Sequence, residues 1–236
     1  MSTHLLESVA VSEQVRLPRA TGELRSNPAW AYSRAKRALD LFISVMALVV
    51  TFPLAVLIAL VIRLDSPGPV FFSQQRVGEN RRRRNVGYGG PERRRHDYGG
   101  KPFQILKFRT MRTGVEPYAW SPHHVADPRL TTVGSALRSA CLDELPQLIN
   151  VIRGDMSVVG PRPEMPFIVA TYPDEAKCRL DVRPGITGPW QIRGSRTRPI
   201  HEALHLDLEY LEVQSFRADL RIVAETLVFM VRRLNV

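Results

Sequence analysis

The apolar run LFISVMALVVTFPLAVLIALVI, residues 41–62, decides the architecture of this chain. Its 22 residues carry no charged side chain, and Arg37 and Arg63 lie on either side of it. About 20 apolar residues are enough to cross the hydrocarbon core of a bilayer, so the run predicts a membrane helix. A helix buried in a soluble core is the alternative, but such a helix normally carries polar residues on one face.

The sequence Thr51-Phe52-Pro53 lies near the middle of this run. A proline removes one backbone hydrogen bond and clashes with the preceding turn, so we expect the helix to kink or break there. Each half is then about ten residues, or roughly 15 Å, which is too short to cross a bilayer alone. Basic residues mark the cytoplasmic side of a membrane, and both flanks are basic. These observations favour a re-entrant helix–break–helix over a straight span.

The composition of the whole chain is that of a globular protein. The 236 residues are 44% hydrophobic and 24% charged, which excludes a wholly disordered chain and a multi-span membrane protein. Two cysteines, Cys141 and Cys178, exclude a disulfide scaffold and a four-cysteine metal site. The net charge of +10 indicates an anionic partner, and residues 76–112 contribute +9 of it.

The sequence CLDELPQL, residues 141–148, holds two adjacent carboxylates, Asp143 and Glu144. Pro146 is tolerated only in the first turn of a helix, which places the pair at or just before a helix N-terminus. Free backbone N–H groups and the helix dipole stabilise anions there. An ionised carboxylate in that position can act as a nucleophile or as a Mg²⁺ ligand. A simple charge pair at the start of a helix is equally compatible with these residues.

Basic residues in short, stiff segments form a second group of candidates. A guanidinium on a stiff backbone is well positioned, and Arg binds phosphate through two hydrogen bonds. Surface salt bridges would explain any one of these residues, but together they predict a pocket for a polyanion. The candidate phosphate-binding residues are Lys107, Arg109, Arg138, Arg162 and Arg183.

Other features carry less functional information. His123 and His124 have no partner at metal-ligand spacing, so we expect a solvated loop, and Cys141 is expected to be a buried core residue. No phosphate-binding P-loop and no dinucleotide-binding glycine motif occurs. The Arg-, Tyr- and Gly-containing segment at 80–100 is typical of RNA-binding tails, but no nucleic-acid-binding motif accompanies it. We therefore expect no nucleic-acid partner.

From Lys36 to the C-terminus the sequence resembles the bacterial sugar transferase family, the monotopic phosphoglycosyl transferases that act on polyprenyl phosphate. The motifs that carry the resemblance are, in order, KRALDLFISV at 36–45, SPGPVFFSQQRVG at 66–78, KPFQILKFRTM at 101–111, LRSACLDELPQLINVIRGDMSVVGPRP at 137–163, VRPGITG at 182–188 and LDLEYL at 206–211.

The resemblance implies transfer of a sugar 1-phosphate from a nucleoside diphosphate sugar, expected to be a UDP-sugar, to polyprenyl phosphate. By this resemblance Asp143 attacks the sugar-bearing phosphate, Glu144 orients or assists, and Mg²⁺, with Asp143 as a ligand, neutralises the diphosphate. It also implies exopolysaccharide or glycoconjugate assembly at the cytoplasmic face of the bacterial inner membrane. A non-catalytic membrane scaffold of the same fold is the alternative.

The sequence departs from the family pattern in two places. Phe52-Pro53 replaces the Ser-Pro pair that commonly breaks the membrane helix, although Thr51 can still bond to a freed carbonyl. Residues 80–100 are longer than the short turn expected there. We hypothesise that this basic loop holds anionic lipid headgroups, each Arg near the surface contributing roughly 1 kcal/mol.

The predicted fold class is α+β and helix-rich, with a small cytoplasmic catalytic domain built around short strands. The chain divides into a mobile tail at 1–30, a re-entrant membrane helix at 31–64 and a catalytic domain at 65–236 that contains the low-complexity loop at 80–100.

Within the catalytic domain, residues 70–72 and 103–111 are expected to form strands, and 137–152 and 200–211 helices. One further helix has an apolar face that we expect to pack on the core rather than on a membrane, made of Leu220, Val223, Leu227, Met230 and Leu234.

Overall fold

The computed structural model describes residues 30–81, 98–116, 122, 127–193 and 203–234. The predicted tail, most of the basic loop and the His123-His124 pair therefore lie outside the described residues. The elements are, in chain order, α2 (Trp30–Asp65), β1 (Phe71–Val77), β2 (Pro102–Phe108), α4 (Thr132–Ser139), η1 (Leu142–Glu144), α5 (Gln147–Arg153), β3 (Ser157–Val159), α6 (Pro166–Val169), η2 (Asp174–Asp181), β4 (Gly185–Thr187), α7 (Pro189–Arg193), α8 (Leu204–Val213) and α9 (Phe216–Leu234). This is the helix-rich α+β architecture that the sequence predicts.

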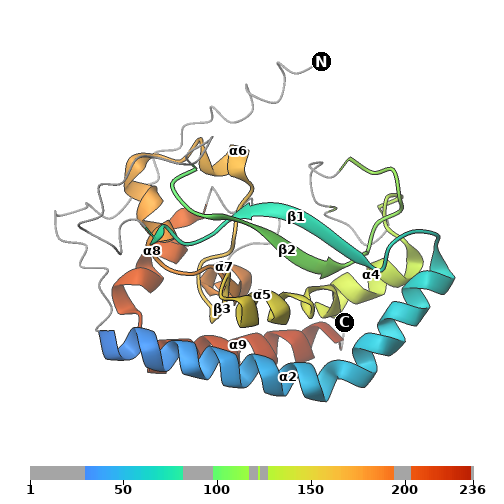
Figure 1. Cartoon of the computed structure of the whole chain (residues 1–236), viewed down its shortest axis with the longest axis horizontal. Coiled ribbons are helices and arrows are strands. Elements are labelled where there is room, and N and C mark those ends of the chain that lie inside the picture. The colour runs from blue at the N-terminus through green and yellow to red at the C-terminus, as the bar shows by residue number, and fades with distance from the viewer. Residues whose placement is uncertain (1–29, 82–97, 117–121, 123–126, 194–202, 235–236) are drawn as a thin grey trace.

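The long helix α2 contains the whole apolar run and continues through Pro53. Of the two predicted outcomes at Pro53, a break into two helices is therefore wrong, because the backbone stays helical on both sides of the proline. Figure 1 shows that α2 bends part-way along instead. The Thr51 hydroxyl donates to the Ala47 carbonyl at 2.7 Å, one turn back, a bond that often accompanies helix bending.

Strands β1 and β2 confirm the two predicted extended segments and form an antiparallel ribbon. Phe71 pairs with Phe108 at one end of the ribbon and Val77 with Pro102 at the other. Figure 1 shows this ribbon lying on the opposite side of α5 from α2. The side chains of Phe103 and Ile105 enter a buried cluster, where they meet residues of α5 and the turn that follows it.

The predicted helix at 137–152 is two helices separated by a 3₁₀ turn: α4, η1 and α5. Cys141 causes the interruption, because its φ of 57° lies in the left-handed region that an α-helix cannot include. Cys141 is half-buried in this turn, so its predicted place in the core is wrong. Pro146 then precedes the first residue of α5, where its missing N–H costs nothing.

The C-terminal helix α9 packs on the short parallel pair β3–β4 and on α7. Its buried face centres on Asp219 and Ile222, whereas Leu220 and Leu227 are 58% and 59% exposed. The expectation that this face packs on the core is therefore wrong for Leu220 and Leu227, whereas Val223 of the same face does pack against a buried cluster. The helix is amphipathic, but the face that packs on the protein core is the neighbouring one, so the two leucines are left exposed.

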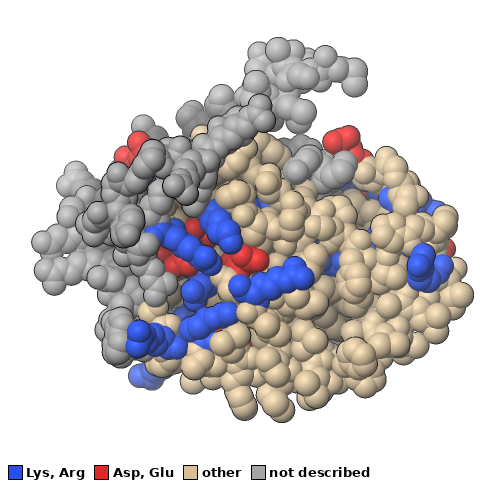
Figure 2. Space-filling view, viewed as in Figure 1, with Lys and Arg blue, Asp and Glu red and all other residues tan. Residues whose placement is uncertain are grey.

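An uncharged surface runs along one edge of the molecule, where α2 and α9 lie (Figures 1 and 2). Lys and Arg side chains gather instead at the end where α2 begins and on the face beside it. We call this edge the apolar edge. Its large exposed hydrophobic side chains are Phe42, Val45, Met46, Val49, Val50, Phe52, Leu54, Val56, Leu57, Leu60 and Leu64 of α2, and Leu220, Leu227, Val228 and Val231 of α9.

The first turns of α2 are bonded to the rest of the chain by charged side chains. Arg37 donates to the carbonyls of Val151 and Ile152, at 2.7 and 3.1 Å, and so satisfies the C-terminal end of α5. Asp40 accepts from the Ser157 hydroxyl at 2.8 Å and from the Val158 N–H at 3.1 Å, both on β3. The apolar helix is therefore part of the domain rather than an appendage.

Candidate active site

Asp143 and Glu144 form the η1 turn between α4 and α5. The Thr131 hydroxyl caps α4 by accepting the Gly134 N–H at 2.9 Å, and the left-handed Cys141 then redirects the chain. Both carboxylates come just before the first turn of α5, as the sequence predicts. Asp143 is only 7% exposed, so its carboxylate is in a largely dry environment.

Three basic residues surround the two carboxylates. The Lys107 ammonium lies 2.6 Å from Glu144 Oε1 and 4.0 Å from Asp143 Oδ2. Arg162 donates to the same Glu144 oxygen at 2.9 Å. Arg138 lies close enough to act electrostatically on Asp143 and on Glu144. We call these five residues the carboxylate–cation cluster.

The surroundings shift the pKa values of the two carboxylates in opposite directions. Burial raises the pKa of Asp143, as does the negative charge of Glu144, and Lys107 and Arg138 counteract this only in part. Burial also raises the pKa of Glu144, but Arg162 and Lys107 together outweigh it and hold that pKa below its usual range. Glu144 is thus a fixed anion that neutralises two cations, while Asp143 is a destabilised and more basic carboxylate.

Lys107 reaches the cluster because α5 is bonded to β2. Asn150, which is fully buried on α5, accepts the Leu106 N–H at 3.0 Å and donates to the Gln104 carbonyl at 2.7 Å. One amide therefore satisfies two backbone groups of the strand next to Lys107. Sequence reasoning missed Asn150, and its place in a predicted helix between apolar residues is the signal that could have found it.

The structure places two predicted phosphate ligands outside the carboxylate–cation cluster. Arg109 is 5% exposed and donates to the carbonyls of Ile62, Ser66 and Pro67, at the end of α2. Arg183 pairs instead with the buried Glu79, with 3.5 Å between Nε and Oε2. Arg109 thus bonds the end of the apolar helix to β2, two residues from Lys107.

The cluster lies beside a buried apolar group to which α2 contributes. Ile58 and Ile62 of α2 pack with Phe108 and Leu137, and Leu142 of η1 packs against the same buried group. The residue before Asp143 therefore belongs to the apolar packing that joins η1 and α4 to the second half of the apolar helix.

The donor chemistry of the cluster fits one way of binding Mg²⁺. Within the part of the chain that the structure describes, no group of three or more His, Cys, Asp or Glu side chains could hold a metal by itself. Mg²⁺ is, however, commonly held by one or two carboxylates together with substrate phosphates. Asp143 fits that role, whereas Lys107 and Arg162 already engage Glu144.

The family model for bacterial sugar transferases matches residues 31–87 and 89–233. The chain belongs to this family. The matched residues include the carboxylate–cation cluster and all but the terminal residue of α2 and of α9, so membership covers the site as well as the apolar helix. The resemblance noted from the motifs and the assignment of the chain as a transferase are both confirmed.

Individual relatives agree with the family match. The chain is 38% identical over 208 residues to the UDP-glucose:undecaprenyl-phosphate glucose-1-phosphate transferase of Caulobacter vibrioides, covering 84% of this chain and 70% of the relative. It is 34% identical over 226 residues to the exopolysaccharide production protein ExoY of Sinorhizobium fredii, covering 89% and 90%. A glucose-1-phosphate transferase of Escherichia coli K12 with the same name as the first is 36% identical over 196 residues, covering 80% of this chain and 38% of that protein.

Proposed function

We propose that this protein transfers a sugar 1-phosphate from a UDP-sugar to undecaprenyl phosphate, as a step in exopolysaccharide assembly. The observation that carries the proposal is the placement of a buried carboxylate with a raised pKa, Asp143, beside three cations and next to Leu142, which packs against the apolar group that α2 helps to form. The printed names of the relatives supply the substrate class, and UDP-glucose is the first donor to test.

In the first step a carboxylate oxygen of Asp143 attacks the phosphorus that carries the sugar. A bond forms between that oxygen and the phosphorus, and the bond to the bridging diphosphate oxygen breaks, which releases UMP. The raised pKa of Asp143 suits a nucleophile, since a more basic carboxylate is the stronger one. Arg138 and Lys107 offset the charge of the phosphates, which is the main task in phosphoryl transfer.

In the second step a phosphate oxygen of the lipid attacks the same phosphorus and displaces Asp143. The products are polyprenyl-diphosphate-sugar and the free carboxylate, so no net proton transfer to the protein is needed. Glu144 keeps Lys107 and Arg162 in place throughout, because its ionised form bonds both. When bound, Mg²⁺ would supply further neutralisation of the diphosphate, with Asp143 as its protein ligand.

The apolar edge supports a location at the membrane. One helix, over Ser33–Asp65, is long and apolar enough to cross a bilayer. Its bend and its basic flanks favour a re-entrant course with both ends on the cytoplasmic face of the inner membrane. A cysteine at Ser33 and another at Leu64, in a chain with both native cysteines replaced, would then be labelled from the cytoplasm only. Labelling of the two positions from opposite sides would show a straight span.

The activity is tested with purified protein in detergent, Mg²⁺, undecaprenyl phosphate and a panel of UDP-sugars. Release of UMP by the wild type and its loss in Asp143→Asn is the expected result, and a phosphosugar adduct on Asp143 should be seen by mass spectrometry without the lipid acceptor. An Asp143→Asn variant that matches the wild type would exclude Asp143 as the nucleophile. No turnover with any donor would favour the non-catalytic scaffold.

A further inference from the structure

The backbone of the segment that carries Arg162 is bonded at four successive carbonyls. Pro161 accepts the Gly185 N–H at 2.9 Å, Pro163 accepts from the Arg76 guanidinium at 3.4 Å, and Glu164 accepts the Val77 N–H at 2.9 Å. The two prolines on either side have no N–H of their own and fix their φ angles. The segment has no regular secondary structure, so these bonds and the prolines determine its course.

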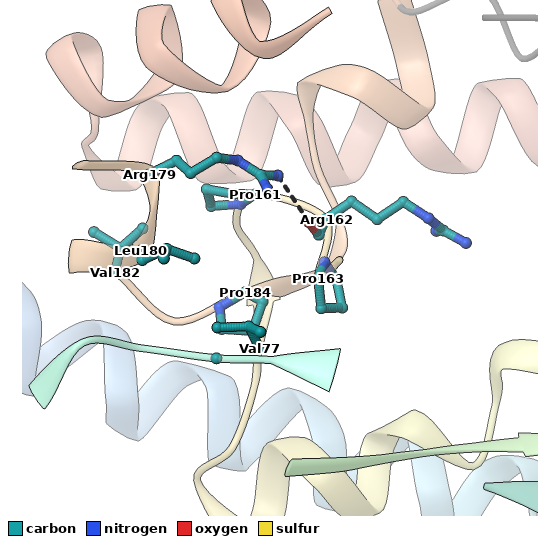
Figure 3. A pocket seen from close by; sticks show the side chains of 9 residues that line it. Val77, Pro161, Arg162, Pro163, Arg179, Leu180, Val182 and Pro184 are labelled. Atoms are coloured by element: carbon teal, nitrogen blue, oxygen red, sulfur yellow. Dashed lines mark hydrogen bonds between the residues drawn. The ribbon is translucent and has the colours of Figure 1, made fainter. Parts of the chain in front are cut away.

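The fourth carbonyl, that of Arg162 itself, accepts from a buried side chain. Arg179 of η2 donates to it at 2.8 Å, and Figure 3 shows this bond beside a small cavity. The Arg162 side chain leaves the backbone in the direction away from Arg179, so the two ends of this residue have separate partners. One end bonds Arg179, and the other bonds Glu144 in the carboxylate–cation cluster.

Arg179 is itself held by two side chains and is only 2% exposed. Its guanidinium donates twice to Asp207 of α8, at 3.1 and 2.5 Å, and once to the Tyr172 hydroxyl at 2.9 Å. Both oxygens of Asp207 are buried, and Oδ1 has no hydrogen-bond partner among the described residues. A buried ion pair with an unsatisfied oxygen is a poor source of stability, because its desolvation offsets much of its attraction.

We propose that Arg179, held by Asp207 and Tyr172, is a positioning residue for Arg162 and acts through the Arg162 carbonyl. The assignment rests on the proposed function, in which Glu144 and its two cations, Lys107 and Arg162, form the charged surroundings of Asp143. Only a guanidinium can bond Asp207, Tyr172 and the Arg162 carbonyl at once, since its donors fan out in one plane. The network thereby joins α8 and η2 to the nucleophile's surroundings without any of its side chains entering the cluster.

The Arg162 guanidinium has a second rigid contact. Its central carbon lies 5.6 Å from the ring centroid of Trp190 on α7, within the range of a cation–π interaction. Arg162 is thus fixed at its carbonyl by Arg179 and at its guanidinium by Trp190 and Glu144. A shift of the carbonyl would move the side chain relative to these partners, and displacements near 1 Å can reduce turnover about 100-fold.

The test is a double-mutant cycle between Arg179→Lys and Arg162→Lys, measured by UMP release in a single turnover. A lysine at 179 keeps the charge for Asp207 but cannot also reach the Arg162 carbonyl. We expect Arg179→Lys to lower the rate by about 10- to 100-fold in the wild-type background and by less than about twofold in the Arg162→Lys background. Tyr172→Phe, which leaves the Arg162 carbonyl bonded, should retain most of the activity.

Asp219→Asn is the matched control. Asp219 is buried and bonds Lys36 at 2.7 Å and the Tyr210 hydroxyl at 2.6 Å, so it forms a cation–carboxylate–tyrosine group like that of Arg179. These two bonds join α9 to α2 and α8 rather than to the Arg162 segment, so the effect of Asp219→Asn on the rate should be small and equal in both backgrounds.

Two results would overturn the inference. They are a folded Arg179→Lys protein within twofold of the wild type, or an equal loss in both backgrounds, which would show a general structural role. Should Arg179→Lys not fold, the same cycle with the milder Asp207→Asn decides in the same way. An inactive wild type would instead count against the proposed function.

Discussion

Replacing Glu144 by glutamine removes the fixed anion of the site and keeps its shape. In the structure one oxygen of Glu144 accepts from Lys107 at 2.6 Å and from Arg162 at 2.9 Å. Hydrogen bonds to charged groups contribute about 1.5–3 kcal/mol each. The three side chains are 19%, 19% and 24% exposed, so solvent screening reduces the sum, and we expect a loss of about 2 kcal/mol.

A loss of this size is measurable by thermal unfolding in detergent. For a chain of this length 1 kcal/mol corresponds to roughly 2–4 °C, so Glu144→Gln should lower Tm by roughly 4–8 °C at neutral pH. The pKa of Glu144 is held below its usual range, so its stabilisation is complete above the usual glutamate pKa and disappears as the pH falls through the lowered value. The difference in Tm between the two proteins should therefore shrink in acid.

The same variant should change the pH dependence of the reaction. Glu144 raises the pKa of Asp143, and its removal also leaves Lys107 with Asp143 as its nearer carboxylate. We therefore expect the acidic limb of the rate profile to move to lower pH while the maximal rate falls. Glu212→Gln, an exposed carboxylate on α8, is the matched control and should change neither Tm nor the profile. An unchanged Tm and acidic limb in Glu144→Gln would refute the assignment of Glu144 as the fixed counter-ion.

Three further predictions follow from other parts of the structure. Asp143→Asn should unfold at a higher temperature than the wild type at neutral pH, because the raised pKa of Asp143 means that folding penalises its charged form. This gain in Tm should shrink as the pH falls below the raised pKa and be gone below the ordinary aspartate pKa, and an unchanged Tm at neutral pH would contradict the buried anion. Gly134→Ala should lower the free energy of unfolding by about 3 kcal/mol or more in the same assay, because a Cβ at position 134 would lie 2.0 Å from the Thr110 carbonyl oxygen. The control Ala136→Gly, on the exposed side of α4, should lower it by only about 1 kcal/mol. Leu227→Asp should weaken flotation with liposomes without lowering turnover in detergent, and equal flotation would show that this part of the apolar edge does not contact lipid.

The elements set by short-range rules could be predicted from the sequence. The alternating FQILKF segment is β2, and Pro146 does mark the start of α5 after the acidic pair. Lys107, Arg138 and Arg162 were predicted to share an anion site, and they do gather around Asp143 and Glu144. Short-range features of the sequence, such as prolines, alternating apolar residues and the sign of the charge, were enough for these predictions.

The features that depend on tertiary contacts could not be predicted. Arg109 lies in the same short basic segment as Lys107, but its guanidinium donates to backbone carbonyls at the end of α2 instead of entering the site. The left-handed backbone of Cys141 has no signal in a non-glycine residue, so the turn inside 137–152 was missed. Arg179 and Asp207 are 28 positions apart, and only the fold shows that they are partners.

The bonds that α2 makes at both of its ends have a consequence for how this enzyme can be made. Removing residues 30–65 would take Ile58 and Ile62 away from Phe108 and Leu137 and would leave the β3 backbone without the Asp40 carboxylate. A fragment that lacks α2 should therefore be less stable than the whole chain, and an unrelated helix in its place would not restore the bonds made by Arg37 and Asp40. The apolar helix and the carboxylate–cation cluster thus belong to one folding unit, which a detergent micelle or a bilayer has to accommodate as a whole.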